Sequence, residues 1–572
     1  MAWKIQGELN MKHRETIMHF RGLLTGVLFV ILLLGSLLLC RYTNSFGSWL
    51  PYNVLAYISA IAVCVQLCLS RNFRINTADF LLLSYCLYAI VRMWLSKETY
   101  IEPLTIVKWL LLSLLYIAGR LSRNTKVPVV LITVGVGGVL SYLFGFFFNP
   151  SHLGVYASTG VCGTICLLLE NDKSLFKKIL LASLSILLLI ILVLSKSRGA
   201  FLALFLALAY LWFSSDKYRG LKPNRKRLIC ALLSGVVLVG AFLLYRIRTG
   251  SADVRLLIWS SSGEAFLKVP LFGYSSASVQ SLYMPWQAEY FQANPISPFA
   301  PFATNHYQTF NEYLHILCEQ GLVGFILFAL FVVYSFRKCR NRELVAASIS
   351  LGTSSFFLYT YDIIPIIILA PLFLGLASSC EINGNCNEIK KKRWPARLLL
   401  CAVVLTLTSV VCWNVGKGYS SAEKDLKEFI RLPEDSMADR IRPASESIIL
   451  RNKDMTLLYA THSFRLSPQD HTAVLEQCSK RITVVEMMSA LGNLYLDSSL
   501  NDKAERCFIL AHYMAPDRMV PKYDLFKFYR DKGDSGKAKE WADIILSSAP
   551  RTYNAITIEI KAAAREFVKS SR

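Results

Sequence analysis

The sequence predicts an all-α, polytopic membrane helix bundle with a large outer loop and a C-terminal soluble helical-repeat domain. Apolar residues make up 54% of the 572 residues and charged residues only 18%, whereas soluble proteins average about 25% charged residues. Apolar stretches of about 17–20 residues recur up to position 415, and each is long enough to cross the hydrocarbon core as a helix. The composition becomes that of a soluble protein from position 416 onward.

About 12–13 apolar stretches qualify as membrane spans. They lie at 22–40, 51–70, 77–95, 101–119, 126–148, 152–169, 177–195, 198–214, 227–245, 319–336, 343–360, 362–379 and 396–414. The span boundaries are unsettled in two regions. The stretch 343–379 fits one re-entrant hairpin as well as two spans, and 177–214 contains two spans separated by a very short turn. No small-residue cleavage site follows the first stretch, so we expect a retained span and no cleaved signal peptide. We predict a membrane domain over 1–415 and a soluble domain over 416–572.

Positive charge alternates from loop to loop along the membrane domain. The N-terminal tail and every second loop after it are rich in Lys and Arg, whereas the loops between them are poor in both. The positive-inside rule then places the N-terminus in the cytoplasm. With an odd number of spans, the large loop at about 246–318 and the C-terminal domain lie outside. The net charge of +23 is concentrated in short loops between spans, so we expect contact with membrane lipids and no nucleic-acid partner.

Two cations interrupt the apolar stretch between Ser185 and Phe213. Lys196 and Arg198 fall on the predicted outer side, against the charge rule. One interpretation is that their side chains extend to outer lipid headgroups. The other, which we favour, is that they bind an anion at the outer surface of the membrane. The second interpretation predicts further anion-binding groups on the same face.

Further ionisable residues are predicted on this outer face. Arg92 lies near the outer end of the third span, Lys108 lies about two turns into the fourth, and a predicted helix over 252–267 places Arg255 with Trp259 and Ser262. The cations of the face are therefore Arg92, Lys108, Lys196, Arg198 and Arg255, and its histidines are His152, His306 and His315. Because the guanidinium group binds phosphate through two charge-assisted hydrogen bonds and stays charged, the cluster predicts a diphosphate site.

The sequence gives no sign of a metal or a cofactor. No paired carboxylates, Cys-x-x-Cys pair or zinc spacing indicates a metal site, and no Gly-rich loop indicates a nucleotide. We therefore predict that arginines, without a metal ion, stabilise a phosphate leaving group.

Four motifs in chain order resemble those of the O-antigen ligase and O-antigen polymerase superfamily. They are "NPSH" at 149–152, "SKSRGAFLAL" from 195, "RLLIWSSSGEAFLKVPLFGYSSASV" from 255 and "NEYLHILCEQGLVG" from 311. The resemblance implies a metal-independent glycosyltransferase at the periplasmic face of the bacterial inner membrane. Such an enzyme moves a glycan from an undecaprenyl diphosphate carrier to an acceptor hydroxyl, either on a lipid A core, on a growing polymer or on a protein.

The resemblance also implies roles for individual residues. The arginines of the family correspond to Arg198 and Arg255, which would hold the diphosphate. The family usually has a His before the Asn of the last motif, and this position is Phe310 here. His306, one helical turn earlier, is the predicted general base; the alternatives are that Glu312 or Glu319 is the base and that His306 is an exposed loop residue.

Three more residues complete the predicted site. His152, Asn311 and His315 are predicted to bind substrate. His315 has the alternative role of packing at the start of the tenth span. A polysaccharide transporter is the competing class of function, but it predicts repeated spans and broken helices near the midplane, and here the charges gather towards one face.

An internal repeat with an offset of 34 residues lies near the C-terminus and is clearest over 485–550. It pairs Leu491 with Leu525, Tyr495 with Tyr529, Ala504 with Ala538, and Pro516 with Pro550. This offset is the tetratricopeptide period, and stacks of such repeats present a concave face to protein partners. The alternative role is a helical cap that stabilises the outer loop.

Overall fold

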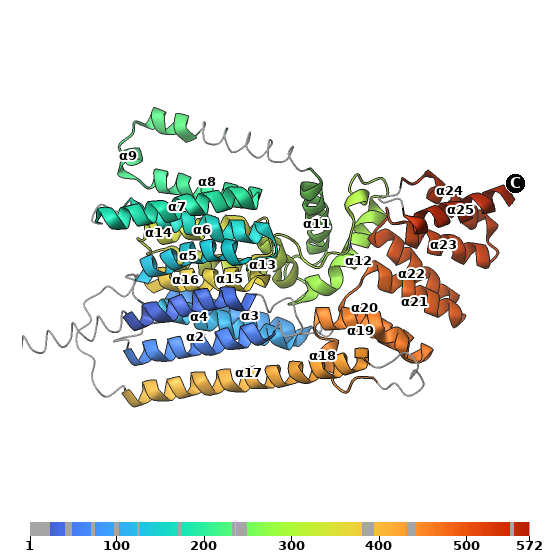
Figure 1. Ribbon diagram of the computed structural model, residues 1–572, viewed down its shortest axis with the longest axis horizontal. Helices are drawn as coiled ribbons and strands as arrows, with labels where there is room; N and C mark the ends of the chain where they lie inside the picture. The colour runs from blue at the N-terminus through green and yellow to red at the C-terminus, as the bar shows by residue number, and fades with distance from the viewer. Residues whose placement is uncertain are drawn as a thin grey trace, which may run out of the picture. The chain divides into compact units, whose positions relative to one another are not determined.

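The computed structural model confirms an all-α polytopic protein. It describes residues 23–40, 49–69, 75–96, 102–122, 126–169, 174–230, 235, 249–379, 394–431, 442–549 and 554–570. Within these ranges the regular structure is helical, and nine helices are long and apolar enough to cross a membrane (Figure 1). Shorter apolar helices cover Arg198–Phe213 and Ile364–Ser378. Most of the predicted span 227–245 lies outside the described residues.

The chain divides into two compact units that do not follow a single boundary in the sequence. The first unit comprises Met1–Leu87, Pro103–Leu244 and Ile326–Tyr419, and the second comprises Tyr88–Glu102, Tyr245–Phe325 and Ser420–Arg572. Each unit is therefore built from segments far apart in the chain.

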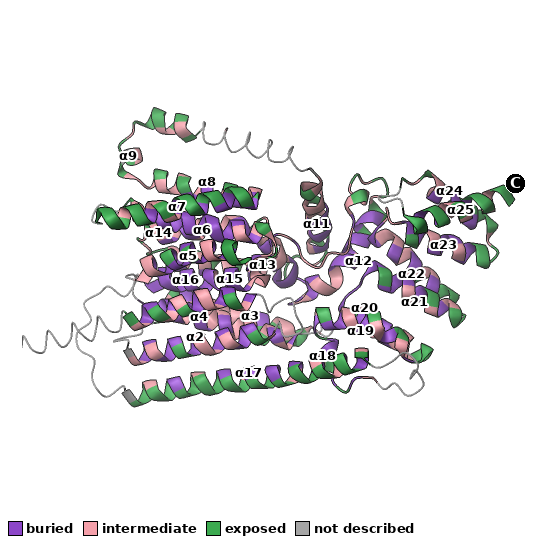
Figure 2. Cartoon of the chain, viewed as in Figure 1, coloured by how far each residue is buried: buried purple, intermediate pink, exposed green. Residues whose placement is uncertain are grey.

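The first unit is the larger part of the membrane bundle. Its described elements are the helix Leu23–Cys40, α2 (Trp49–Leu69), the first part of α3 (Thr77–Leu95), α4 (Pro103–Leu121), α5 (Val127–Phe144), α6 (Pro150–Leu168), α7 (Leu175–Ser195), α8 (Arg198–Phe213), α9 (Asp216–Arg219), the last part of α13 (Glu312–Phe336), α14 (Arg342–Ser355), η4 (Thr360–Asp362), α15 (Ile364–Ile367), α16 (Leu369–Ser378) and the first part of α17 (Trp394–Arg431). Helix α6 is its most buried span and packs against α5, α7, α8 and α14 (Figure 2).

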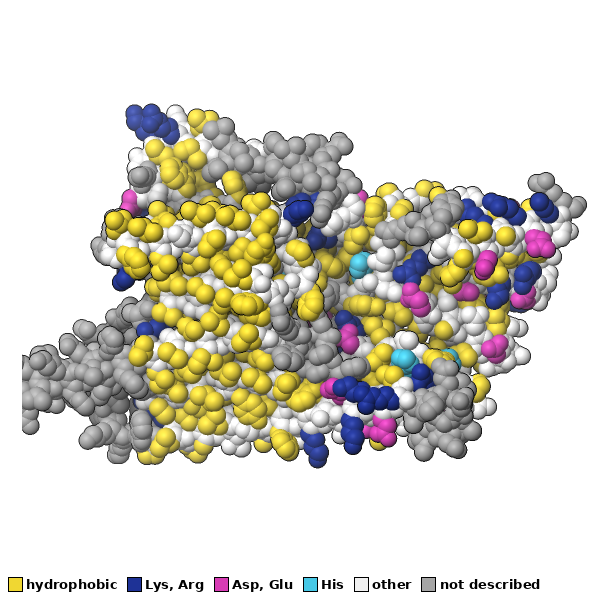
Figure 3. Space-filling model, viewed as in Figure 1, with side chains coloured by type: hydrophobic (Ala, Val, Ile, Leu, Met, Phe, Trp, Pro, Cys, Tyr) yellow, Lys and Arg dark blue, Asp and Glu magenta, His cyan; other side chains and the backbone are white. Residues whose placement is uncertain are grey.

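Close helix contact in the first unit depends on small residues. Gly375 of α16 lies against the backbone of α4, so that a Cβ atom at this position would be 2.2 Å from the carbonyl oxygen of Tyr116. Apolar side chains such as Leu180, Ile186 and Val193 of α7 are more than half exposed, and Figure 3 shows hydrophobic side chains over the visible face of these helices. Exposed apolar surface of this extent suits contact with lipid.

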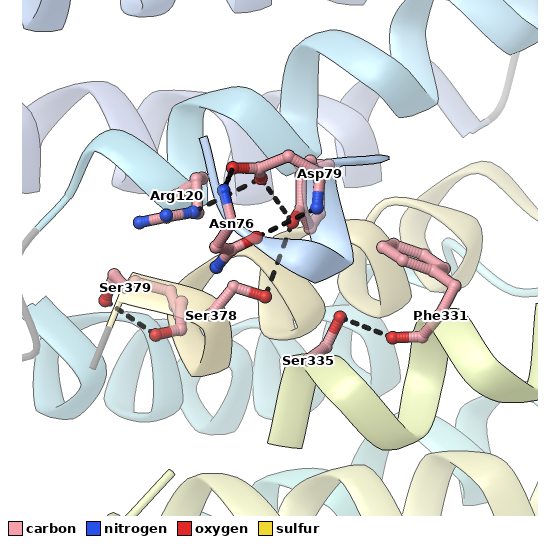
Figure 4. Close-up of polar contacts among 9 residues, drawn as sticks. Asn76, Asp79, Arg120, Phe331, Ser335, Ser378 and Ser379 are labelled. Carbon is pink, nitrogen blue, oxygen red and sulfur yellow. Dashed lines mark hydrogen bonds and ion pairs between the residues drawn. The ribbon is translucent and has the colours of Figure 1, made fainter. Parts of the chain in front are cut away.

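A buried polar cluster joins α3, α4 and α16 (Figure 4). Arg120 is only 1% exposed, and its Nε lies 3.3 Å from Asp79 Oδ1, which also accepts a hydrogen bond from the Tyr116 hydroxyl at 2.7 Å. Asn76 and Asp79 each accept the other's backbone N–H at 2.9 Å, which caps the start of α3. The ion pair of Arg120 with Asp79 joins the end of α4 to the start of α3. Separating the two helices here would leave a buried charge uncompensated, which is costly.

The second unit contains the outer-loop region and the C-terminal helices. Its elements are the last part of α3, α11 (Thr249–Lys268), α12 (Ser278–Ala293), η3 (Ala300–Phe302), the first part of α13, the last part of α17, α18 (Glu446–Ile449), α19 (Lys453–His462), η8 (Ser463–Arg465), α20 (Pro468–Arg481), α21 (Val485–Asp497), α22 (Asn501–Met514), α23 (Met519–Asp531), α24 (Ser535–Ser547) and α25 (Ala555–Ser570). Helix α11 confirms the helix predicted over 252–267.

The C-terminal helices repeat with the predicted spacing. Helices α21 and α23 begin 34 residues apart, and so do α22 and α24. Each pair forms a helical hairpin, and the second hairpin packs against α25. The offset of 34 thus corresponds to a repeated pair of helices. Assignment of these pairs to the tetratricopeptide class stays a prediction.

Candidate functional site

The predicted site residues fall into two groups, one in each unit. Lys108, His152, Lys196 and Arg198 belong to the first unit. Arg92, Arg255, His306, Asn311, Glu312, His315 and Glu319 belong to the second. Each group is described below by its own contacts.

Lys196 and Arg198 lie at the predicted turn between two spans. Helix α7 ends at Ser195 and α8 begins at Arg198. Lys196 is exposed and adopts the left-handed conformation, with φ at 50°, which reverses the chain at the end of a helix. Ser197 is buried against α6, since a Cβ atom at Gly154 would lie 2.6 Å from the Ser197 Cβ. The turn is therefore fixed against the first turns of α6, where His152 lies.

An acidic residue that the sequence did not reveal joins this group. Asp362 of η4 lies with its Oδ1 3.4 Å from Lys108 Nζ, and both side chains are partly exposed. Lys108 also lies over the ring of Tyr52, 5.1 Å from its centroid. The two members of the ion pair are 254 residues apart in sequence, and no local pattern marks Asp362 as the partner of Lys108.

The segment from 357 to 362 connects the residues of the first group. The ring of Tyr359 makes an edge contact with the buried ring of His152, with 4.9 Å between the centroids. Phe357 lies against Gly199, directly after Arg198. The segment thus contacts His152, the start of α8 and, through Asp362, Lys108. Two of the predicted residues, His152 and Lys108, therefore contact this segment directly, and Arg198 directly precedes the glycine that Phe357 touches.

In the second unit, the ring of Phe310 contacts both Arg255 and His306. The Arg255 guanidinium is 5.8 Å from the centroid of the Phe310 ring, and the His306 ring meets the same ring edge-on at 6.1 Å. Phe310 has φ at 50°, a conformation in which a bulky side chain is uncommon. Trp259 of α11 holds the preceding residue, because its Nε1–H donates to the Thr309 carbonyl at 3.1 Å. Arg255 and Trp259 thus share one face of α11, as predicted.

His306 is half-buried in the loop between η3 and α13, and is not the exposed residue that one interpretation expected. Its Nε2 lies 2.9 Å from Thr304 Oγ1, and its backbone N–H donates to Met284 Sδ at 3.3 Å. Burial lowers the pKa of His306 to about 4. The imidazole is therefore neutral at pH 7, and its buried position makes it a weaker base than an exposed histidine.

Asn311 and Glu312 form the start of α13. The Asn311 Oδ1 accepts the backbone N–H groups of Tyr313 at 3.0 Å and Leu314 at 3.1 Å, as a helix N-cap does. The Glu312 side chain is buried in the first turn, where the helix dipole favours a negative charge. The amide oxygen of Asn311, predicted to bind substrate, is thus engaged in capping.

His315 and Glu319 face each other one turn apart on α13. The His315 Nε2 lies 3.3 Å from Glu319 Oε1, and Glu319 is the more buried of the two. The helix is interrupted just beyond them at Gly321, where φ is 65° and ψ is −171°. The span predicted over 319–336 therefore begins earlier, at Glu312, and contains a break.

The break in α13 is filled by the backbone of the turn at 270–275. Cys318 and Glu319 accept the N–H groups of Tyr274 and Ser275, both at 2.8 Å, in place of their partners in a regular helix. On the other side of the break, the N–H groups of residues 322 and 323 donate to the carbonyls of residues 270 and 271. Every backbone group that the break frees at these positions is thus paired again, as a membrane helix requires.

Arg92 holds this turn in place. Its NH2 group donates to the Gly273 carbonyl at 2.8 Å, and its guanidinium lies 5.8 Å from the centroid of the Phe272 ring. The Tyr88 hydroxyl, one turn earlier on α3, donates to the Gln320 carbonyl at 2.6 Å. The end of α3 therefore contacts both the turn and the break in α13, and Arg92 takes part in positioning them.

Part of the chain is similar to a known protein family. A family model described as O-antigen ligase matches residues 183–329. The matched range contains the turn at Lys196, all of α11 and α12, and the loop that carries His306. Over this range the chain is similar to membrane enzymes of the O-antigen ligase and polymerase type. No curated protein matches the chain.

Proposed function

We propose that the protein transfers a glycan from an undecaprenyl diphosphate carrier to an acceptor hydroxyl at the periplasmic face of the bacterial inner membrane. The observation that carries this proposal is the match to the O-antigen ligase model over 183–329. That range contains Arg198 and Arg255, which are predicted to bind the diphosphate, and His306, which is predicted to accept the proton. The donor, the acceptor and the absence of a metal ion are parts of the proposal.

The proposed step divides the work between cations and a base. The acceptor hydroxyl attacks the anomeric carbon of the glycan and loses its proton to neutral His306, while the bond from that carbon to the diphosphate oxygen breaks. The diphosphate leaves on the carrier lipid, and its added negative charge is stabilised by the cations Arg92, Lys108, Lys196, Arg198 and Arg255. Glu312 and Glu319 are the alternative bases, and His152, Asn311 and His315 are proposed to contact substrate.

The distribution of charge within the first unit supports the proposed orientation. Among the described residues, the turn between α7 and α8 carries two cations, Lys196 and Arg198. At the opposite ends of these helices, the first turn of α7 contains Lys177 and Lys178, and the basic stretch 217–227 follows α8. The positive-inside rule places the basic end in the cytoplasm, which puts the turn at Lys196 on the periplasmic side.

Three acceptors remain within the proposal: a lipid A core, a growing polymer, or a protein. An envelope glycan gel of a deletion strain distinguishes them. Loss of all glycan from lipid indicates a ligase, loss of long chains with single units retained indicates a polymerase, and loss from proteins alone indicates an oligosaccharyltransferase. An unchanged pattern in all three would contradict the proposal and favour polysaccharide transport.

The role of the turn is tested by complementation of the same strain. We expect Arg198→Ala to abolish transfer and Arg198→Lys to retain part of it, with both proteins present in the membrane at wild-type levels. Lys177→Ala is the matched control, because Lys177 is an exposed cation at the other end of α7. Normal transfer by Arg198→Ala would remove this residue from the diphosphate site.

A further inference from the structure

The loop that carries His306 is contacted by the C-terminal helices α19 and α21, and it is joined to the end of α22 through Gln287 of α12. Asn305, the neighbour of His306, donates from its Nδ2 to Glu486 Oε2 at 2.8 Å, and its Oδ1 accepts the backbone N–H of Val485 at 3.3 Å. Both bonds reach the first turn of α21. The amide of Asn305 therefore has one donor and one acceptor fixed by a helix that lies about 180 residues further along the chain.

Glu486 is itself held by a cation of the next helical pair. The guanidinium of Arg518, which directly precedes α23, pairs with the Glu486 carboxylate. Burial alone would raise the pKa of Glu486, but the hydrogen bonds from its own backbone N–H, Asn305 and Arg518 lower it below the ordinary value. The carboxylate is thus charged at neutral pH. The loop therefore binds at the start of α21, and the residue that precedes α23, Arg518, pairs with the same carboxylate.

A second contact at the same loop is fully buried. Gln287 of α12 is 0% exposed, and its Nε2 donates to the carbonyl of Thr304 at 3.2 Å and to that of Met514 at 2.6 Å. Its Oε1 accepts the hydroxyl of Tyr283 at 2.8 Å. Thr304 is also the residue whose hydroxyl contacts His306. One buried amide therefore joins the end of α22, helix α12 and the loop two residues before the predicted base.

Contacts on either side extend this attachment. Arg481, the last residue of α20, is 1% exposed and donates to Gln280 Oε1 on α12 at 3.0 Å. Lys453 of α19 lies over the ring of Tyr307, 5.1 Å from its centroid. C-terminal helices thus contact the side chains of Asn305 and Tyr307, on either side of His306. The carbonyl of Thr304 is joined to the end of α22 indirectly, through Gln287 of α12.

We propose that the C-terminal helices position His306 for catalysis, with Asn305, Glu486 and Gln287 as positioning residues. The proposal rests on the proposed function of His306 as the base. It gives the C-terminal helices a role in the rate of transfer, which neither a protein-binding repeat nor a cap that only stabilises the loop would have. A base must lie within hydrogen-bond reach of the hydroxyl proton, and a displacement of 1 Å costs as much as 10²-fold in rate. A loop fixed on both sides of His306 meets this requirement.

A reversal of the Asn305–Glu486 hydrogen bond tests the proposal. Asn305→Asp has nearly the same shape but places a second carboxylate against Glu486, so the two groups repel each other. Adding Glu486→Gln supplies a donor to the new carboxylate and restores the bond in the opposite direction. Asp531→Asn is the matched control, because Asp531 pairs with Arg530 at 2.8 Å on α23 and no contact of that pair involves the loop.

The first readout is hydrogen exchange of the full-length protein in detergent. We expect Asn305→Asp to raise deuterium uptake in the peptide covering 303–311, and the double variant to return it to the wild-type level. This measurement needs no substrate, so it stands even if glycan transfer is the wrong reaction. Unchanged uptake in Asn305→Asp, or uptake that the second substitution fails to lower, would overturn the positioning role.

The second readout is the pH profile of transfer from a lipid-linked glycan. We expect kcat of Asn305→Asp to fall roughly tenfold with KM for the donor little changed. We also expect the acidic limb of the profile to move towards pH 6.5, because a displaced His306 gains solvent. The double variant should recover both, and Asp531→Asn should alter neither. A normal rate and profile with raised uptake would overturn the positioning role, whereas failure of the wild-type protein to transfer any glycan would contradict the proposed function instead.

Discussion

The guanidinium of Arg255 lies over the ring of Phe310, 5.8 Å from its centroid, while the same guanidinium donates to the carbonyl and the hydroxyl of Ser251 one turn earlier, both at 3.0 Å. The planar group is therefore held on two sides before any anion arrives. The motif resemblance implies a histidine at the position of Phe310. In this chain the aromatic ring contacts both the guanidinium of Arg255 and the imidazole of His306, the proposed base.

Phe310→Leu tests this orientation. The leucine cannot form the cation–π contact, so we expect a loss of about 0.5–1 kcal/mol of coupling with Arg255, and a higher KM for the glycan donor. The coupling is measured as a double-mutant cycle with Arg255→Met, by thermal unfolding of the purified protein. Additive effects of the two substitutions would show that the ring does not hold the guanidinium.

His306→Gln separates hydrogen bonding from proton transfer. The glutamine amide can still contact Thr304, but it cannot accept a proton, so we expect transfer to fall by at least about 10²-fold. In the wild-type protein the pKa of about 4 predicts that the rate is maintained as the pH falls to 5 and is lost near pH 4. An acidic limb near pH 6.5 in the wild-type protein would contradict the burial of the imidazole.

The same lowered pKa affects stability with a defined sign. Between pH 6.5 and about 4 the unfolded chain binds a proton at His306 that the folded protein does not. The folded state is therefore favoured fully above pH 6.5 and loses stability as the pH falls to about 4. We expect thermal unfolding of His306→Gln to be less sensitive to pH than that of the wild-type protein over this window.

Lys196→Gly separates the conformation of the turn from its charge. Lys196 adopts φ at 50°, which costs a residue with a Cβ roughly 1 kcal/mol relative to glycine. We therefore expect Lys196→Gly to raise the unfolding temperature while transfer falls, and Lys196→Arg to retain transfer. If Lys196→Gly transfers normally, the cation serves the headgroup region of the membrane and not the diphosphate.

Local patterns in the sequence account for part of the fold and the site. The turn at Lys196, the helix that carries Arg255 and the helical pairs offset by 34 residues follow from apolar periodicity, composition and repetition, which act over short distances. The ion pair of Lys108 with Asp362 and the bond of Asn305 to Glu486 join residues 254 and 181 positions apart. Such pairs are set by tertiary packing, so no local pattern marks them.

The role of Arg92 shows the same limit. Its position near the end of a span predicts an anion-binding group, and Arg92 does lie in the last turn of α3. However, its NH2 group donates to the Gly273 carbonyl of a turn that is inserted into the break in α13. That insertion depends on four backbone hydrogen bonds between segments that are each unremarkable in sequence, apart from the glycines at 273 and 321. Side-chain patterns carry no information about such bonds.

Gly321→Ala tests the inserted turn. The residue has φ at 65° and ψ at −171°, and a Cβ atom there would lie 2.4 Å from the carbonyl oxygen of Leu271. We expect a loss of stability of about 1–3 kcal/mol from the backbone conformation alone, and a lower transfer rate because Glu319 and the turn shift. Gly263→Ala is the control, since no atom lies within 4 Å of a Cβ at this helical position, and we expect it to be neutral or stabilising. An unchanged unfolding temperature for Gly321→Ala would contradict the break in α13.

Equivalent positions of the two C-terminal helical pairs exchange a large and a small side chain. Gly492 of α21 lies against the ring of Phe508 on α22, so that a Cβ atom at Gly492 would be 2.4 Å from a ring carbon. At the positions 34 residues later, the large residue is Phe526 on the first helix and the small one is Ala542 on the second, both fully buried in one cluster. In the first pair of helices the aromatic ring between the two helices comes from the second helix, and in the second pair it comes from the first helix.

This exchange gives a prediction for the first pair. Gly492→Phe alone overfills a buried contact, and Phe508→Ala alone leaves a cavity, which costs about 3–5 kcal/mol. The double variant copies the arrangement of Phe526 and Ala542, so we expect it to recover most of the stability lost by either substitution, measured by thermal unfolding of the full-length protein. A double variant less stable than both single variants would show that the two pairs of helices do not share one packing geometry.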